Sequence, residues 1–262
     1  MKRLRQICMG ITAAAGMVLA SPHASKEADG MYLITKQPVP SEILMRSYRF
    51  MGGLKHFRLD ALTLSDQTEA SEGAAVHVVT FTHKTEVNMV RPYKLRIKTR
   101  GDIKNRNYFF DRGSFVVYDS DTGYYGTLKV PAKIDAALDY LFDRFHVKTA
   151  LANLLYSDLY RRIPPKNKGV YLGISRVGGI ACHHLAFASD THEYQVWVGA
   201  EDKPLIYKFI IIDKTLPYMP RSVNILKWDI SVKPKAERFM FVPPEGAVKI
   251  DILPADKIKE RP

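Results

Sequence analysis

The feature that most constrains the fold of this chain is a long series of short segments in which apolar and polar residues alternate. The clearest spans Tyr93 to Lys98, where every second residue is apolar and every other one is Lys or Arg. Successive side chains of a β-strand point to opposite faces of a sheet. This segment therefore predicts a strand with one apolar and one cationic face, beginning after Pro92, where a strand can start.

The same pattern recurs along the chain and predicts about ten or eleven strands. The candidate strands span residues 57–61, 74–82, 93–98, 107–111, 115–118, 124–130, 169–177, 180–187, 194–198, 205–212 and 222–230, with a short final piece at 239–241. Turn sequences such as Asp111-Arg112-Gly113 separate several of them by only a few residues. Connections this short favour antiparallel hairpins.

Three segments have the periodicity of helices instead. Residues 41–51 begin at Ser41, a candidate N-cap, and end at Gly52-Gly53. Residues 134–145 carry a wide apolar stripe at i, i+3, i+4 and i+7 spacing. A further helix is expected from Leu151 to Leu159, before Pro164-Pro165.

These elements predict a mainly β domain of the α+β kind. An antiparallel sheet of this many strands tends to curl, and its apolar face needs a cover. The amphipathic helices supply that cover, so we expect a single curved antiparallel half-barrel with a helical plug. Apolar space between sheet and plug is where small-molecule sites usually form.

The first residues have the character of a secretory leader. Basic residues Lys2, Arg3 and Arg5 precede an apolar stretch from Ile7 to Leu19 that is too short to span a membrane comfortably. Small residues before Ser21 favour cleavage there, and an uncleaved anchor is the alternative. We expect a signal peptide at 1–20, a flexible segment at 21–37, the folded domain at 38–253 and a tail at 254–262. The mature protein should be soluble and periplasmic, without a stable transmembrane anchor.

The charge balance is positive. The chain carries 39 Lys and Arg against 27 Asp and Glu, and removal of the leader's three basic residues leaves 36 against 27. In an exported protein this surplus favours anionic partners such as lipid headgroups or acidic glycans, and a solvated basic face is the alternative. Export makes nucleic acid an unexpected partner. Cleavage also leaves Cys182 as the single cysteine, so no intramolecular disulfide can form.

Cys182, His183 and His184 follow one another and invite comparison with a metal or catalytic site. On a strand, however, Cys182 and His184 point one way and His183 the other. A zinc site needs three or four converging ligands, and a Cys–His catalytic pair needs an orienting partner and an oxyanion pocket. We expect neither: the thiol should be packed and a histidine hydrogen-bonded at the sheet surface.

Other motifs also favour structural roles. Asp119, Asp121 and Gly123 resemble part of a calcium loop, but the loop is too short and lacks the terminal acidic ligand, so a turn is expected. Asp135, Asp139 and Asp143 lie opposite the apolar stripe of their helix and suggest a solvated face, and Trp197 and Trp228 suggest wall or core aromatics. G-x-S-x-G, H-E-x-x-H and Walker motifs are absent from the sequence. We therefore predict no metal, no cofactor and no enzymatic activity.

Several segments resemble a family of predicted periplasmic bacterial proteins without an established activity. They include RPYKLRIKTRGD, YYGTLKVPAKIDAALDYL, LANLLYSDLY, VGGIACHHLAFASDTHEYQVWVGAEDKPLIYKFIII and FMFVPPEGAVKID, and the resemblance covers roughly residues 40–252. That family is assigned to the superfamily of the lipoprotein carrier LolA, which includes LppX and RseB. The resemblance implies a curved half-barrel, a helical plug and a cavity able to hold acyl chains. Tyr194, in place of a more frequent Trp, and Arg112, in a usual Asp-Gly turn, depart from the family and put only local geometry in doubt.

Two functions follow from these expectations. The first is binding or carriage of a lipid or lipoprotein acyl chain in the cavity; the second is an interaction or sensing module that contacts an envelope protein and fills the cavity with its own side chains. The residues expected to line the cavity are Leu44, Tyr48, Met51, Leu95, Ile97, Ile134, Leu138, Leu141, Phe142 and Phe145.

Overall fold

One twelve-stranded sheet organises the part of the chain that the computed structural model describes, residues 38–70, 76–103, 105–146, 150–165 and 167–255. The predicted signal peptide at 1–20 and the predicted flexible segment at 21–37 lie outside the described residues. The strands are β1 (His56–Ala70), β2 (Val76–Val90), β3 (Lys94–Gly101), β4 (Arg106–Asp111), β5 (Ser114–Asp119), β6 (Tyr124–Lys129), β7 (Val170–Val177), β8 (Ile180–Ala188), β9 (His192–Gly199), β10 (Ile206–Asp213), β11 (Arg221–Asp229) and β12 (Val248–Lys249).

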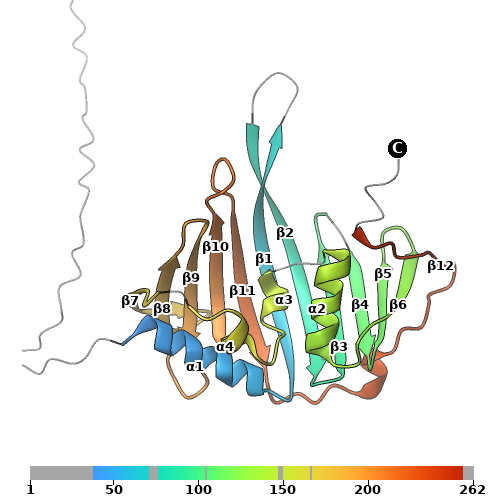
Figure 1. Cartoon of the computed structure of the whole chain (residues 1–262), viewed down its shortest axis with the longest axis horizontal. Coiled ribbons are helices and arrows are strands. Elements are labelled where there is room, and N and C mark those ends of the chain that lie inside the picture. The colour runs from blue at the N-terminus through green and yellow to red at the C-terminus, as the bar shows by residue number, and fades with distance from the viewer. Residues whose placement is uncertain (1–37, 71–75, 104, 147–149, 166, 256–262) are drawn as a thin grey trace, which may run out of the picture. The chain divides into compact units, whose positions relative to one another are not determined.

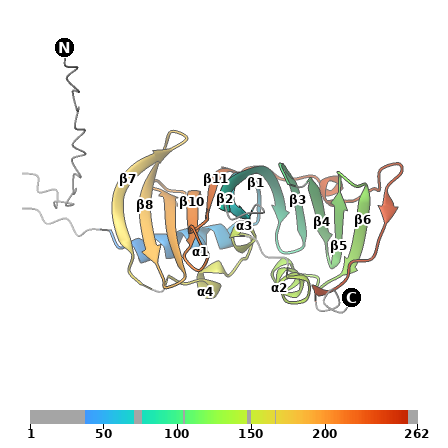
Figure 2. The ribbon, with the colours of Figure 1, turned by 90° about the horizontal axis from the view of Figure 1, so that it is seen from above.

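The sheet consists of two antiparallel meanders joined at the centre. Its strand order is β12-β6-β5-β4-β3-β2-β1-β11-β10-β9-β8-β7, with β1 paired to β11. The first meander runs from the centre to one edge and the second returns from the other edge. Among the strands that the structure describes, only the two-residue β12 pairs in parallel, with β6. The two edges do not meet, so the predicted mainly β, curved and unclosed antiparallel sheet is confirmed (Figure 2).

This strand order explains where the helices lie. Strands β6 and β7 follow one another in the chain but stand near or at opposite edges of the sheet. The connection must therefore cross a whole face, and it does so through α2 (Ile134–Phe145), α3 (Ala150–Asn153) and α4 (Leu159–Arg162). Helix α1 (Pro40–Gly53) covers the same face, which we call the helix face (Figures 1 and 2). The opposite face is called the outer face.

Strand register sorts the side chains between these faces. Leu59, Val87 and Ile97 are paired neighbours on β1, β2 and β3 and belong to the apolar helix face. The alternate residues Asp60, Glu86 and Lys98 are likewise neighbours, on the outer face. Period-two alternation thus produces one apolar and one charged face, as predicted for residues 93–98.

Some predicted elements differ from those observed. The first two strands extend to fifteen residues each, because threonines and single charges continue them past the apolar stretches. Residues 239–241 do not form a strand: Phe239 is the last residue of a 3-10 helix, η1 (Ala236–Phe239), and the next two residues belong to no helix or strand. Strand β12 was not predicted, since two residues carry no periodicity. Within the described residues, no helix is both long and apolar enough to cross a membrane.

Two helix boundaries also need correction. Helix α1 begins at Pro40 rather than after Ser41, and its N-cap residue Val39 makes no side-chain cap. Proline suits the first helical position because its missing N–H would have no intrahelical partner there. The helix expected from Leu151 to Leu159 is instead two short helices separated by a turn at residues 154–158. Helix α2 has the predicted bounds.

The departure at Arg112 leaves a tight turn in place. Arg112 and Gly113 connect β4 to β5 with positive φ angles of 46° and 91°. Two central residues with positive φ suit the twist of a two-residue hairpin. Arginine therefore occupies a left-handed position that Asn or Asp more often fills.

Candidate ligand-binding cavity

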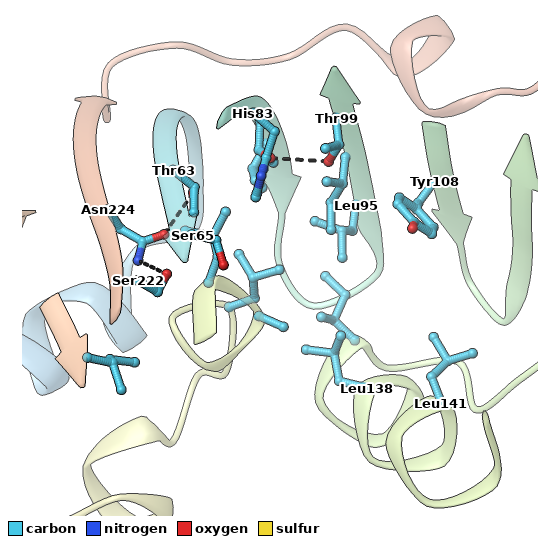
Figure 3. Close-up of a pocket in the computed structure, with 18 of the residues that line it drawn as sticks. Thr63, Ser65, His83, Leu95, Thr99, Tyr108, Leu138, Leu141, Ser222 and Asn224 are labelled. Atoms are coloured by element: carbon cyan, nitrogen blue, oxygen red, sulfur yellow. Dashed lines mark hydrogen bonds between the residues drawn. The ribbon is translucent and has the colours of Figure 1, made fainter. Parts of the chain in front are cut away.

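The main cavity lies between the helix face of the sheet and helices α2 and α3. Its volume is about 530 Å³. Aliphatic and aromatic side chains of β2–β5 form its floor, and α2 and α3 form its roof (Figure 3). The apolar residues of this floor and roof include Val87, Leu95, Ile97, Tyr108, Phe110, Phe115, Ile134, Ala137, Leu138, Leu141, Leu151 and Leu155.

Five of the residues expected at a cavity line this one. Leu95 and Ile97 come from β3, and the α2 stripe contributes three more, Ile134, Leu138 and Leu141. They meet because the apolar stripe of α2 faces the apolar residues of the strand that alternation identified. Leu141 is 6% exposed, and Ile134 is 1% exposed.

Two further expected residues line a different cavity. Leu44 and Tyr48 of α1 lie in a smaller apolar space of about 230 Å³ against β8–β10 and α4. The pKa of Tyr48 is raised to about 12, mainly by burial and to a smaller extent by the nearby Tyr194. Its hydroxyl therefore stays protonated at neutral pH. Ile211 lines both cavities.

The remaining three expected residues line neither of these cavities. Met51 is 1% exposed and belongs to the core beneath α1. Phe145, at the last turn of α2, packs against the core, and Phe142 is 40% exposed. Periodicity predicted that these residues lie on the apolar stripes of their helices. Each stripe is broader than the part of the helix that faces the cavity, so residues at its edges lie outside the cavity.

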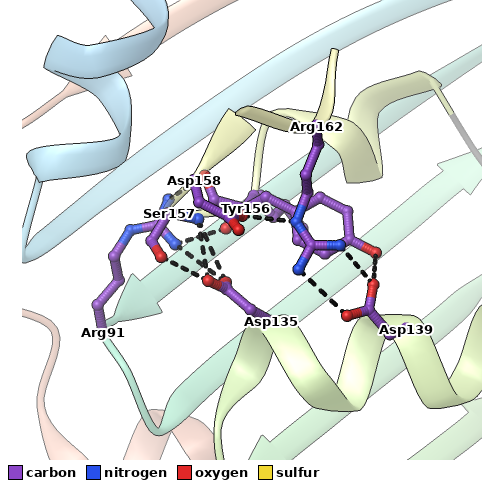
Figure 4. A network of polar contacts seen from close by, with 8 residues as sticks. Arg91, Asp135, Asp139, Tyr156, Ser157, Asp158 and Arg162 are labelled. Atoms are coloured by element: carbon purple, nitrogen blue, oxygen red, sulfur yellow. Dashed lines mark hydrogen bonds and ion pairs between the residues drawn. The ribbon is translucent and has the colours of Figure 1, made fainter. Parts of the chain in front are cut away.

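A polar network, which the sequence analysis did not anticipate, holds the roof together. Asp139 of α2 accepts hydrogen bonds from the Tyr156 hydroxyl, 3.0 Å away, and from both terminal nitrogens of Arg162, at 2.7 and 3.1 Å. Asp135 accepts the Ser157 backbone N–H at 3.2 Å and its hydroxyl (Figure 4). Asp135 and Asp139 were expected on a solvated face; instead they tie α2 to the α3–α4 turn.

The buried Arg91 supports this turn from the sheet. Its guanidinium donates to the backbone carbonyls of Leu155 and Tyr156, and it lies 3.9 Å from the Asp135 carboxylate. Burial lowers the pKa of Arg91 from its ordinary value, and the neighbouring carboxylates of Asp135 and Asp158 oppose this. The roof is therefore connected to the sheet through one buried cation. Aspartates at helical spacing, such as Asp135 and Asp139, do not by themselves predict such a network. The residues that they bind are distant in the sequence.

The Cys182 region has the arrangement expected for packed residues. Burial raises the pKa of the Cys182 thiol to about 11, so the thiolate is scarce at neutral pH. His183 Nδ1 lies 3.0 Å from the Tyr171 hydroxyl, whereas the His184 ring stacks on Trp197 with centroids 4.0 Å apart. Burial lowers the pKa of both histidines. No cluster of three or more potential metal ligands occurs in the described ranges.

The Asp119–Gly123 segment is a turn. The Asp119 carboxylate accepts the backbone N–H groups of Asp121 and Thr122 at 3.0 and 3.3 Å. The Asp121 carboxylate accepts two hydrogen bonds from Asn105.

Trp228 packs on Phe57 with ring centroids 5.2 Å apart, and its indole N–H donates to the Ile206 carbonyl.

The outer face carries a shallow groove with a cationic rim. Lys84, Lys98, Arg100 and Lys227 line it together with Asp60 and Glu86. Arg58 binds both carboxylates, and Arg238 also contacts Glu86. The four lining cations make no ion pair with any residue that the structure describes. The cationic face predicted from alternation is thus on the side away from the cavity.

Similar solved structures come from several bacteria. LprF from Mycobacterium bovis is 10% identical, with 76% of this chain and 99% of LprF covered and a TM-score of 0.45. A LolA superfamily protein from Nitrosomonas europaea is 9% identical, with 78% and 98% covered and a TM-score of 0.34. The lipoprotein LppX from Mycobacterium tuberculosis is 10% identical, with 76% and 99% covered and a TM-score of 0.35. No curated protein matches this chain significantly.

A family model also matches the chain over residues 41–253, from the second residue of α1 to beyond β12. The match takes in every strand and helix described above and the linings of both cavities. The chain therefore belongs to the family described as predicted periplasmic protein (DUF2092).

Proposed function

We propose that this protein binds the acyl chain of a lipidic molecule in the main cavity, within the bacterial periplasm. The observation that carries the proposal is a volume of about 530 Å³ lined mainly by apolar side chains of both sheet and helices. Small-molecule sites commonly have volumes of about 300–1,000 Å³. The alternative, an interaction module whose cavity is filled by its own side chains, is less well supported by an open space of this size.

The apolar walls supply the binding energy in this proposal. Each methylene transferred from water to such a surface contributes about 0.8 kcal/mol. About ten methylenes would contribute on the order of 8 kcal/mol before the entropy cost of association is subtracted. A micromolar dissociation constant corresponds to a net binding free energy of about −8 kcal/mol. Reaching it therefore requires an acyl chain longer than about ten carbons, or additional contacts from the head group, to offset the entropy cost of association.

A titration with a fluorescent long-chain fatty acid tests the proposal. The protein should first be stripped of lipid by organic extraction and refolded, and saturable fluorescence should then appear. Leu141→Arg should abolish it, because the substitution places a charge in the apolar space beneath α2. Ala136→Arg is the matched control: Ala136 is exposed on the same helix, and binding should be unchanged.

Two results would contradict the proposal. One is the absence of a saturable signal with protein whose circular dichroism and thermal transition show that it is folded and free of lipid. The other is an equal effect of both arginine substitutions, which would place the probe outside the cavity. Either result would favour the interaction module.

A further inference from the structure

The helix face of the sheet changes from apolar to polar at the same level on four neighbouring strands. Along β3 the inward residues run from Leu95 and Ile97 to Thr99, and along β2 from Val87 to Thr85 and His83. The same change runs from Ala61 to Thr63 and Ser65 on β1, and from Leu226 to Asn224 and Ser222 on β11. We call the inward residues Thr63, Ser65, His83, Thr85, Thr99, Ser222 and Asn224 the polar band.

Strand pairing makes the band continuous. Thr85 is registered with Thr99, Thr63 with both His83 and Asn224, and Ser65 with Ser222. Figure 3 labels six members of the band, Thr63, Ser65, His83, Thr99, Ser222 and Asn224, on the side of the cavity away from Leu138 and Leu141 of α2. The cavity is therefore amphipathic along the strand direction.

Several members of the band are buried rather than solvated. Thr63, Thr85 and Asn224 are 6%, 5% and 2% exposed. The Thr63 hydroxyl donates to Asn224 Oδ1 at 2.8 Å, Asn224 Nδ2 donates to Ser222 Oγ at 3.1 Å, and the Thr85 and Thr99 hydroxyls lie 3.1 Å apart. A hydroxyl can donate one hydrogen bond and accept two, so this network retains unused donors and acceptors. The Ser65 hydroxyl has no hydrogen-bond partner among the described residues.

The charges around the band are balanced within the protein. Arg221, the single Lys or Arg among the described residues that line the cavity, lies 3.4 Å from the Asp66 carboxylate. The other lining carboxylate, Asp213, accepts hydrogen bonds from the Thr215 hydroxyl and N–H and lies 4.0 Å from His192. An anionic head would thus find no unpaired lysine or arginine among the lining residues that the structure describes. Burial of an unpaired charge is costly.

We propose that the ligand is an amphiphile with an uncharged, hydroxyl-bearing head, such as an acylglycerol or a neutral glycolipid. Its head binds the polar band and its chain extends beneath α2. This inference rests on the proposed function and specifies the ligand class of the same cavity. Hydroxyl groups of such a head both donate and accept, as do the threonine, serine and asparagine side chains that face them.

The test compares two ligands that share one acyl chain, monolauroylglycerol and laurate, by displacement of the fluorescent probe at about pH 8, where laurate is ionised. The native protein should bind monolauroylglycerol at least about tenfold more tightly than laurate. Thr85→Val combined with Thr99→Val removes both partners of one hydrogen bond without leaving either unsatisfied, so the fold should be retained. This double variant should weaken monolauroylglycerol binding about tenfold and leave laurate binding nearly unchanged.

Two controls accompany this comparison. Ser65→Ala should weaken monolauroylglycerol binding to a smaller extent, and Thr127→Val, at an exposed position on β6, should affect neither ligand. Laurate binding as tightly as monolauroylglycerol, or equal losses for both ligands in the double variant, would overturn the inference and leave acyl-chain binding intact. The proposed function would be overturned as well if the probe did not bind, or if it bound outside the cavity and neither ligand displaced it.

Discussion

The thiol of Cys182 illustrates how the surroundings of one side chain determine its chemistry. The residue is 0% exposed, and its Sγ lies 3.5 Å from the Ile180 carbonyl oxygen. His184, two residues along the same strand face, is occupied by Trp197 and by Gln195, whose Oε1 lies 3.2 Å from Nε2. A thiol in these surroundings packs as a small apolar group.

Cys182→Ser should lower the free energy of unfolding by about 1–2 kcal/mol at neutral pH, because a hydroxyl replaces a packed thiol. The pH dependence should change as well. Burial raises the thiol pKa from 9.0 to about 11, so the folded state retains its proton longer than the unfolded state. The stabilisation is complete below about pH 9 and is lost as pH rises towards 11.

Denaturant unfolding between about pH 8 and pH 10.5 measures this contribution. The native protein should lose stability more steeply over this range than Cys182→Ser. If the free energies of unfolding of the two proteins changed in parallel with pH, folding would not raise the pKa of the Cys182 thiol. Tyr48, whose pKa is also raised, contributes equally to both proteins and cancels in the comparison.

Among the elements, the α3–α4 turn shows why the expected helix is interrupted. Its backbone is held by Asp135 and Arg91, and α1 packs directly upon it. A Cβ atom added at Gly52 of α1 would lie 2.2 Å from the Ser157 carbonyl oxygen, whereas one added at Gly53 would contact nothing within 4 Å. The glycine that looked like a helix terminator is therefore also a packing position.

Gly52→Ala should destabilise the protein by about 1–3 kcal/mol or more, because α1 or the turn must move to accommodate the methyl group. Gly53→Ala is the matched control and should be neutral or stabilising by about 0.5–1 kcal/mol, since it removes backbone freedom in the last turn. Thermal or denaturant unfolding of both variants measures the difference. Similar stabilities for the two variants would show that the α3–α4 turn moves to accommodate the methyl group without a loss of folding free energy.

For the whole chain, the leader sequence is expected to direct export. Protein recovered from the periplasmic fraction should begin at or within a few residues of Ser21, as judged by intact mass or N-terminal sequencing. Ala20→Arg places a large charged residue before the cleavage point and should retain the leader. An intact Met1 in the native envelope fraction would instead indicate an uncleaved anchor.

How far the sequence predicts this protein depends on the range of the interactions involved. Period-two alternation identified the helix face at Leu95 and Ile97, and period 3.6 identified α2 to the residue. Both signals are local, because they reflect which side of one element is buried. They therefore predicted the mainly β class and five of the side chains that line the main cavity.

Tertiary structure alone determined the rest of the site. Periodicity could not tell that Leu44 and Tyr48 would line a separate cavity or that Phe142 would be exposed, because the tilt of each helix across the sheet sets these positions. The polar band was also hidden, since its threonines, serines and asparagine come together only when four strands pair in one register. The sequence by itself determined which face of each element is apolar. Long-range strand pairing, together with the crossing of α2–α4 from one side of the sheet to the other, decided what those faces enclose.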